Sequence, residues 1–90
     1  MSSGSADSAG TGARAVVEVL AKALTDRPDV VRVTESQHKD VTLIELFVSR
    51  DDVGKLVGRQ GRTVAALRTL ASTAGEREGK TVTLEIRESR

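Results

Sequence analysis

The stretch Gly58-Arg59-Gln60-Gly61 joins two segments of helical pattern, a short one that ends at Val57 and a longer one over residues 62–74. A connection this short leaves backbone N–H groups at the start of the second helix without partners in that helix. Together with the positive end of the helix dipole, these donors form an anion site that suits phosphate. Glycine at both ends allows positive φ angles and the close approach of a ligand.

Positive charge surrounds residues 58–61, which we call the glycine loop. Lys55 precedes it, Arg59 lies at its tip, and Arg62 follows it. The net charge of the 90-residue chain is only +1, so contact with a polyanion has to come from this local placement. We therefore expect the glycine loop to bind a nucleic-acid backbone.

Outside the glycine loop, the spacing of apolar residues predicts elements in the order α-β-β-α-α-β. Pro28 ends the first helix, and Ser49 with Asp52 resembles a capping pair at a helix start. A polar turn over residues 36–40 makes the first two strands a hairpin. The expected fold is α+β, with a three-stranded mixed sheet and helices packed on one of its faces. Its last two strands run parallel if they are neighbours. The elements cover residues 13–24, 30–35, 41–48, 49–57, 62–74 and 80–87.

The same spacing predicts which side chains face the core. The second strand is apolar on both faces, which is typical of a central strand or of a face covered by a partner. Close packing is expected at Gly54, and Gly75 is expected to end the last helix. The first helix is expected to bury Val16, Val17, Leu20, Ala23 and Leu24, and the last helix Val64, Leu67, Leu70, Ala71 and Ala74.

Composition limits the remaining functions. Residues 1–12 are almost all Ser, Gly, Ala, Thr and Asp, so we expect a disordered tail before a folded domain over residues 13–90. The chain contains no cysteine, which excludes disulfides, thiolate catalysis and cysteine-based zinc sites. It has no secretory-signal pattern and no apolar run of membrane-spanning length, so we expect a cytoplasmic protein without a membrane partner.

Other interpretations of these residues are weaker. A plain helix–helix turn, or a helix-turn-helix DNA reader, would also contain glycine, but here the first helix is short and strands flank the pair. A nucleotide-binding P-loop needs glycine where Leu56 stands and lysine where Arg62 stands. His38 is alone in a polar turn, and Asp51 with Asp52 fits a helix start better than a catalytic pair. We expect no enzyme activity, metal site or cofactor.

Over residues 16–87 the chain resembles KH domains, in particular the small bacterial single-KH RNA-binding proteins of the KhpA type. The similarity is carried by the run from Gly54 to Arg68, GKLVGRQGRTVAALR, with its G-x-x-G sequence between two helices. The resemblance implies a type II KH domain that binds single-stranded RNA, about four nucleotides per domain. It also implies a role as an RNA chaperone or post-transcriptional regulator. The single aromatic residue, Phe47, argues against an RRM or OB-fold, which stack bases on several rings.

The resemblance assigns the RNA contact to the glycine loop and the residues around it. The neutral Gln60 contributes less charge than a lysine would at the loop tip. Bases lie in an adjacent apolar groove, and Val57, Val64 and Leu67 either lie near that groove or belong to the core. The residues assigned to RNA are Lys55, Gly58, Arg59, Gln60, Gly61, Arg62 and Thr63, with Arg68 as a further supporting charge.

The resemblance also implies protein partners. These are a second copy of the chain in a homodimer, and a larger KH protein of the Jag type in a heterodimer. The expected sheet has edges that another copy can extend. An assembly module with weak or indirect RNA contact is therefore the alternative to RNA binding through the glycine loop.

Overall fold

The structure is a computed structural model and describes residues 11–89. The predicted α-β-β-α-α-β order is confirmed, with two short 3-10 turns added. Residues 1–10 of the expected tail lie outside the described residues, whereas Thr11 caps the first helix and Gly12 begins it, one residue earlier than predicted. The elements are α2 (Gly12–Leu24), η1 (Pro28–Val30), β1 (Arg32–His38), β2 (Val41–Val48), α3 (Arg50–Val57), η2 (Arg59–Gly61), α4 (Arg62–Glu76) and β3 (Thr81–Glu88).

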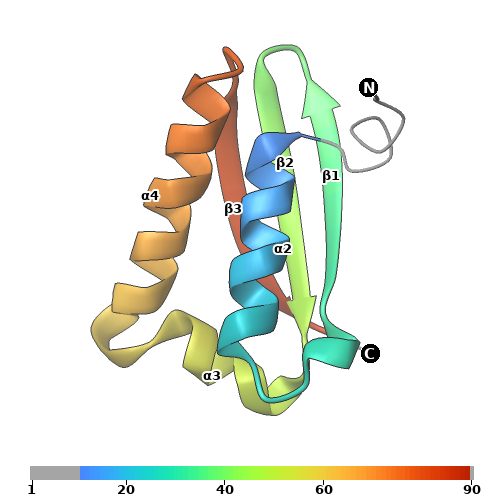
Figure 1. Cartoon of the computed structure of the whole chain (residues 1–90), viewed down its shortest axis with the longest axis vertical. Coiled ribbons are helices and arrows are strands. Elements are labelled where there is room, and N and C mark those ends of the chain that lie inside the picture. The colour runs from blue at the N-terminus through green and yellow to red at the C-terminus, as the bar shows by residue number, and fades with distance from the viewer. Residues whose placement is uncertain (1–10, 90) are drawn as a thin grey trace.

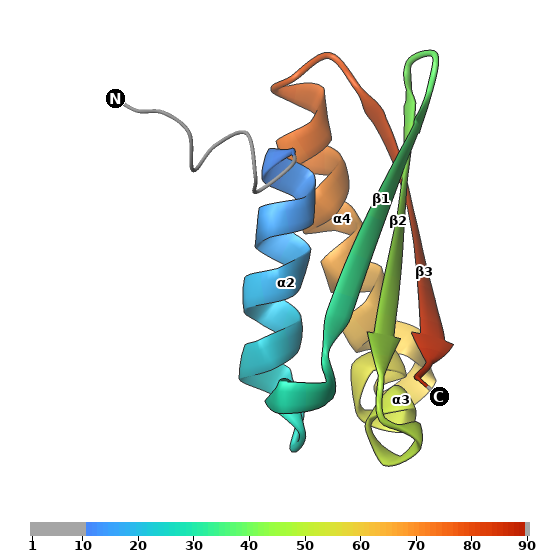
Figure 2. The same cartoon turned by 90° about the vertical axis from the view of Figure 1, so that its right-hand side faces the viewer.

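The sheet forms one layer, and the long helices α2 and α4 lie against one face of it, as Figure 1 and Figure 2 show. The strand order is β1-β2-β3, so β2 is central, which is one of the two interpretations that its apolar residues on both faces allowed. β1 and β2 pair antiparallel, with Arg32 opposite Phe47 and His38 opposite Val41. β2 and β3 run parallel, and α3 and α4 form the crossover between them. The predicted mixed sheet is thus confirmed.

The core lies between β2 and the two long helices. α2 contributes a stripe of Ala13, Val17 and Ala21 at four-residue steps, all fully buried. The small alanines let this helix lie close to the sheet. β2 contributes the alternate residues of one face, as predicted, and these are Thr42, Ile44, Leu46 and Val48.

The predicted core face of α2 is partly wrong. Val17 is buried and Leu20 packs against the core, but Leu24 is exposed. On α4, Leu70 is 48% exposed although the spacing predicted burial. Leu20, Leu24 and Leu70 lie where α2 and α4 meet, on the side away from the sheet. The apolar residues of the two helices therefore extend beyond the stripes that face the sheet. Val16 is only half-buried and Ala23 is exposed for the same reason.

The hairpin turn is tighter than predicted. β1 continues to His38 and leaves only Lys39 and Asp40 as the turn. Lys39 has a φ of 57°, in the left-handed region that two-residue hairpin turns require. The hydroxyl of Thr42 donates to Oε1 of Gln37 (3.0 Å), so polar side chains pair across the strands where a loop was expected.

Two glycines have roles other than those predicted. Gly75 is buried inside α4, which continues to Glu76, so it does not end the helix. A Cβ at position 75 would overlap the side chain of Val82 and lie 3.1 Å from the carbonyl oxygen of Lys80, so glycine allows α4 to contact β3. No atom lies within 4 Å of a Cβ built on Gly54, so close packing does not explain that glycine.

Candidate nucleic-acid interface

The glycine loop reverses the chain between α3 and α4 with positive φ angles. Gly58 has φ 77° and ψ 172°, a conformation that is essentially limited to glycine. Gly61 has φ 74° and ψ 17°, and Gln60 between them has φ 57°. The amide of Gly58 donates to the carbonyl oxygen of Gly54 (2.9 Å), and the amide of Gly61 donates to that of Gly58 (3.1 Å). The loop is therefore a compact, internally bonded turn.

One side of the glycine loop is packed and the other is open. A Cβ on Gly58 would lie 2.9 Å from the backbone nitrogen of Thr63 and 2.7 Å from its Cβ, so no side chain fits there. A Cβ on Gly61 would have no neighbour within 4 Å. The open side lies at the N-terminus of α4, a 15-residue helix whose dipole favours a negative ligand there.

Two guanidinium groups accompany this helix start. Arg59 and Arg62 are both exposed, as is Gln60. Nη2 of Arg62 donates to Oε1 of Gln60 (3.2 Å), so the neutral tip residue orients one of the cations. Gly58 and Thr63 form the base of the loop. The structure thus brings together six of the residues predicted from the sequence.

Lys55, the seventh, lies in the last turn of α3 and is engaged elsewhere. Its ammonium forms an ion pair with the carboxylate of Asp26, in the connection between α2 and η1. The hydrogen bond to Asp26 is the main reason that the pKa of Lys55 is raised. Lys55 is therefore charged and near the glycine loop, but it already has an anionic partner.

Asp52 supports the site in a way that the sequence did not reveal. Its side chain is fully buried, and its carboxylate accepts the backbone N–H groups of Asp26 and Arg27, both at 3.0 Å. It also accepts the hydroxyl of Ser49 (2.9 Å), so Ser49 bonds to a side chain and does not cap the helix with its own. These bonds, that of the Asp26 amide first, lower the pKa of Asp52. Asp52 therefore fastens the α2–η1 connection to α3.

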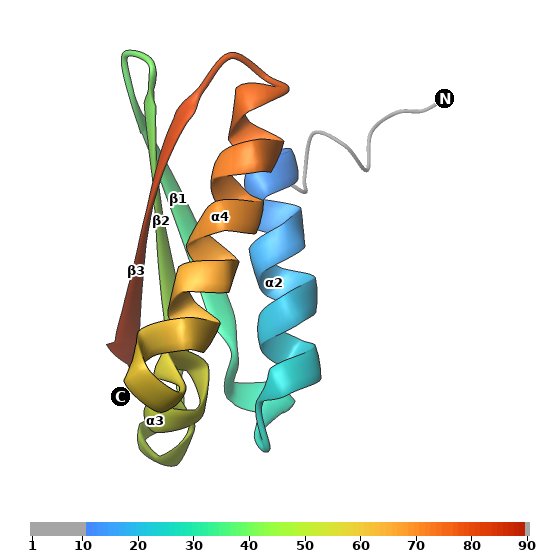
Figure 3. The ribbon, with the colours of Figure 1, turned by 90° about the vertical axis from the view of Figure 1, so that its left-hand side faces the viewer.

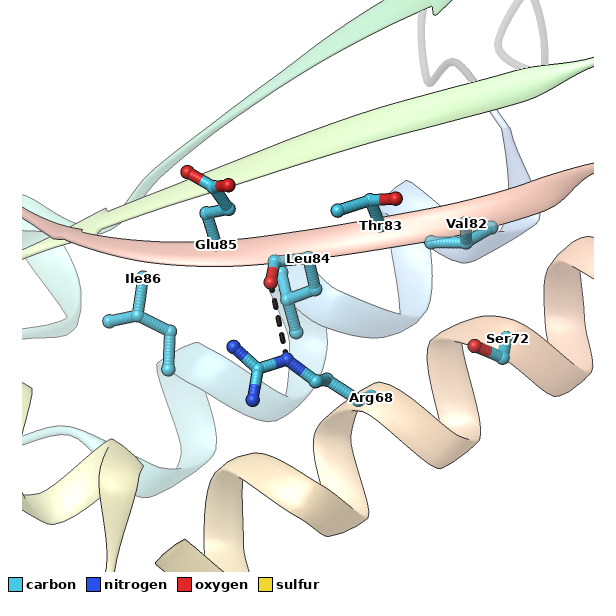
Figure 4. Close-up of a pocket in the computed structure, with 7 residues that line it drawn as sticks. All are labelled: Arg68, Ser72, Val82, Thr83, Leu84, Glu85 and Ile86. Atoms are coloured by element: carbon cyan, nitrogen blue, oxygen red, sulfur yellow. Dashed lines mark hydrogen bonds between the residues drawn. The ribbon is translucent and has the colours of Figure 1, made fainter.

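Arg68 does not belong to the glycine loop. Figure 4 shows it extending from α4 to β3, where its Nε donates to the carbonyl oxygen of Leu84 (3.3 Å). It lies in a groove of about 500 Å³ between α4 and β3, which we call the α4–β3 groove. The other residues that line this groove are Ser72, Val82, Thr83, Leu84, Glu85 and Ile86.

The backbone of β3 gives the groove its polar character. The amides of Thr81 and Ser89 donate toward β2, to Asp40 and Val48. Because strand residues alternate in direction, the amide and carbonyl groups of Val82, Leu84 and Ile86 face away from β2, along the free edge. Figure 3 shows α4 and β3 side by side, with the glycine loop at the end of the molecule where β3 finishes.

The sequence left open whether Val57, Val64 and Leu67 lie near an apolar groove or in the core. Val64 and Leu67 are buried side chains, and Val57 is exposed on α3. None of the three lines the α4–β3 groove. The edge of β3 supplies the lining, and only the pairing of β3 with β2 shows that this edge is free.

Within residues 11–89, no group of three or more histidine, cysteine or carboxylate side chains is arranged to hold a metal ion. The helices of that same segment are too short or too polar to cross a membrane.

Known proteins are similar to this chain over most of its length. The KhpA/KhpB KH-domain family matches residues 14–86. The chain is 47% identical to the RNA-binding protein KhpA of Aquifex aeolicus over 73 residues, which is 81% of this chain and 92% of that protein. It is 44% identical to KhpA of Halalkalibacterium halodurans over 81% and 96% of the two chains. For KhpA of Clostridium perfringens the identity is 42%, over 79% and 95%. This chain therefore belongs to the KhpA/KhpB KH-domain family, and its fold is that of a type II KH domain.

Proposed function

We propose that this chain binds single-stranded RNA without catalysing a reaction, and that the glycine loop contacts the sugar-phosphate backbone. The observation that carries the proposal is the contact of Gly58 with Thr63. This contact seals one side of the loop against α4 and leaves the side at Gly61 open. An anion on the open side meets the helix N-terminus, with Arg59 and Arg62 exposed beside it. The relatives above are named as RNA-binding proteins, which supports RNA as the polyanion.

The α4–β3 groove is proposed to receive the bases. The groove runs along the free edge of β3. The amide and carbonyl groups of this edge are turned away from β2, so they can form hydrogen bonds with the edges of the bases. Arg68 partly covers this edge through its bond to Leu84, so its role is in the groove and not at the phosphates of the loop. With about two or three phosphates bound, log K is expected to fall with log salt at a slope of roughly −1.5 to −2.

The test is the double substitution Arg59→Asp with Gln60→Asp, which places two anions at the proposed phosphate site. A matched control is Lys39→Asp in the hairpin turn with His38→Asp at the end of β1, at the opposite end of the molecule (Figure 1). It changes the net charge by the same amount, and aspartate tolerates the positive φ at position 39. Loss of RNA binding in the loop variant alone supports the proposal. Unchanged binding by the folded loop variant would show that RNA binds elsewhere.

In the cell, this activity would serve an RNA chaperone or post-transcriptional regulator in the cytoplasm. Both roles need binding without catalysis and contact with single-stranded segments. Cross-linking the protein to RNA in cells and sequencing the attached RNA would identify the targets. The Arg59→Asp, Gln60→Asp variant is the background control for that experiment.

Self-association is a second candidate function, and one observation favours it. The outer side of α2 and α4 carries an apolar hollow of about 440 Å³, lined by Ala15, Val16, Val19, Leu20 and Leu70. Val19 is 67% exposed at its edge. A second copy of the chain can place the same surface on this one around a two-fold axis. A Jag-type KH partner would use the same face.

The sheet edges are less suited to assembly than the sequence indicated. The guanidinium of Arg14 donates to the carbonyl oxygen of Val33 in β1 (3.1 Å), and Arg68 does the same to Leu84 in β3. Each edge strand is thus partly covered by an arginine. Sedimentation tests the helical face: Leu70→Glu should give a monomer, and Val41→Glu on the opposite face of the sheet should not. A monomeric parent protein would end this second proposal.

A further inference from the structure

An acidic residue in the connection between α2 and η1 forms an ion pair with a cationic residue of the proposed RNA site. Asp26 and Lys55 are 29 residues apart in the sequence, yet their side chains form a direct ion pair. The two side chains remain 72% and 47% exposed, so water and salt reach the pair. An ion pair this exposed is weak and exchanges partners at little cost.

The position of Asp26 is imposed by the fold. Asp52, buried in α3, accepts the backbone N–H groups of Asp26 and Arg27. The backbone of the connection is thereby tied to the same helix that carries Lys55. Asp51 and Asp52 on α3 also raise the pKa of Lys55 through their charge, and Arg27 pairs with Asp29 at 3.5 Å. Among these carboxylates, Asp26 is the one that forms an ion pair with Lys55.

We propose that Asp26 sets the RNA affinity of this protein by competing with phosphate for the ammonium group of Lys55. In the free protein the carboxylate of Asp26 is the partner of Lys55. When RNA lies on the glycine loop, a phosphate replaces Asp26 as the partner of Lys55, and the carboxylate returns to water. The inference rests on the proposed function. It means that the ion pair between Asp26 and Lys55 has to break before Lys55 can contact RNA.

The test is Asp26→Asn, which keeps the shape of the side chain and the backbone bonds to Asp52. A short labelled single-stranded RNA of mixed sequence, titrated at low salt, should bind about 1.5- to 5-fold more tightly to the variant. The control is Asp29→Asn, which removes the same charge from the adjoining 3-10 turn η1, where the carboxylate pairs with Arg27 and not with Lys55. It should change affinity less. In a protein that already carries Lys55→Gln, Asp26→Asn should change the RNA affinity by about as little as Asp29→Asn does.

A measurement without RNA distinguishes a failure of this inference from a failure of the proposed function. The titration of the Lys55 ammonium, followed by NMR, should move to lower pH in Asp26→Asn and stay in place in Asp29→Asn. A parent protein that does not bind RNA would overturn the proposed function and this inference together. A parent that binds through the loop, with equal effects of the two aspartate substitutions in both backgrounds, would overturn this inference alone.

Discussion

Gly58 and Thr63 are in contact across the glycine loop, so closely that a Cβ at position 58 would lie 2.9 Å from the nitrogen of Thr63. The contact joins the last residue before the loop's tip to the first turn of α4. It explains why the loop needs glycine at this position for two separate reasons, the lack of space and the φ of 77°.

Gly58→Ala should therefore destabilise the protein by about 1–3 kcal/mol, because alanine is strained at this φ and ψ and also overlaps Thr63. It should weaken RNA binding as well, since the loop has to open to accept the methyl group. Urea unfolding and RNA titration measure the two effects. For the unfolding measurement the control is Gly61→Asn, since asparagine tolerates the left-handed conformation and space is free there. Equal losses in both variants would contradict the packing argument.

Asp52→Ala should lower the midpoint of thermal unfolding by several degrees, because the amides of Asp26 and Arg27 lose their acceptor. Circular dichroism during heating measures this change. The neighbouring Asp51 is exposed, so Asp51→Ala removes the same charge with a much smaller effect. If the two variants unfold alike, Asp52 does not fasten the connection to α3.

Acid should destabilise the protein through two carboxylates. Burial alone would raise the pKa of Glu35, but hydrogen bonds from the backbone and hydroxyl of Thr11 and from Gln37 outweigh it, so its pKa is lowered. The pKa of Asp52 is lowered as well. A carboxylate with a lowered pKa in the folded state binds protons more weakly there than in the unfolded chain. Its stabilisation is complete above the unfolded pKa and is lost as pH falls through the folded pKa.

The free energy of unfolding should thus fall as pH drops below about 4. Urea unfolding at a series of pH values measures it. Glu35→Gln should flatten the curve, since the amide cannot be protonated in this range. Glu76→Gln, which removes an exposed carboxylate from α4, serves as the control. A curve of the same slope in Glu35→Gln and in the parent would rule out this contribution.

Gly75→Ala should destabilise the protein by about 1–3 kcal/mol, because the methyl group would overlap Val82 and push α4 away from β3. Gly54→Ala should have the opposite sign. It lies in helix α3 with free space around it, so alanine should stabilise by about 0.5–1 kcal/mol. Urea unfolding distinguishes the two. Adding Val82→Ala to Gly75→Ala should restore part of the loss, and failure to do so would argue against this contact.

Local patterns predicted much of this fold. The limits of β2 are those predicted, because polar residues on both sides, Asp40 and Ser49, bound its apolar run. The glycine loop lies between two helices, as its sequence indicated, and the family resemblance is confirmed by the match over residues 14–86. The sequence predicted that β2 and β3 run parallel if they are neighbours, and the structure shows that they are neighbours and parallel.

The failures have a common physical cause. α2 is apolar on more than one side, so its periodicity did not decide which side meets the sheet. One candidate was the side with Val16, Leu20 and Leu24, and the other was the stripe through Val17. Gly75 fits a helix end by its residue type, and only its contact with Val82 shows that it belongs inside α4. In both cases the deciding interaction is with a residue distant in the sequence.

The sequence alone determined the order of the elements, the central strand and the loop that reverses the chain, because these depend on side-chain periodicity and on glycine conformations within a few residues. The tertiary structure decided which charges are available at that loop. Asp26 and Lys55 meet where Asp52 ties the connection after α2 to α3, and α4 lies close to β3 where Gly75 leaves room for Val82. Such contacts join residues far apart in the chain, and no local pattern encodes them.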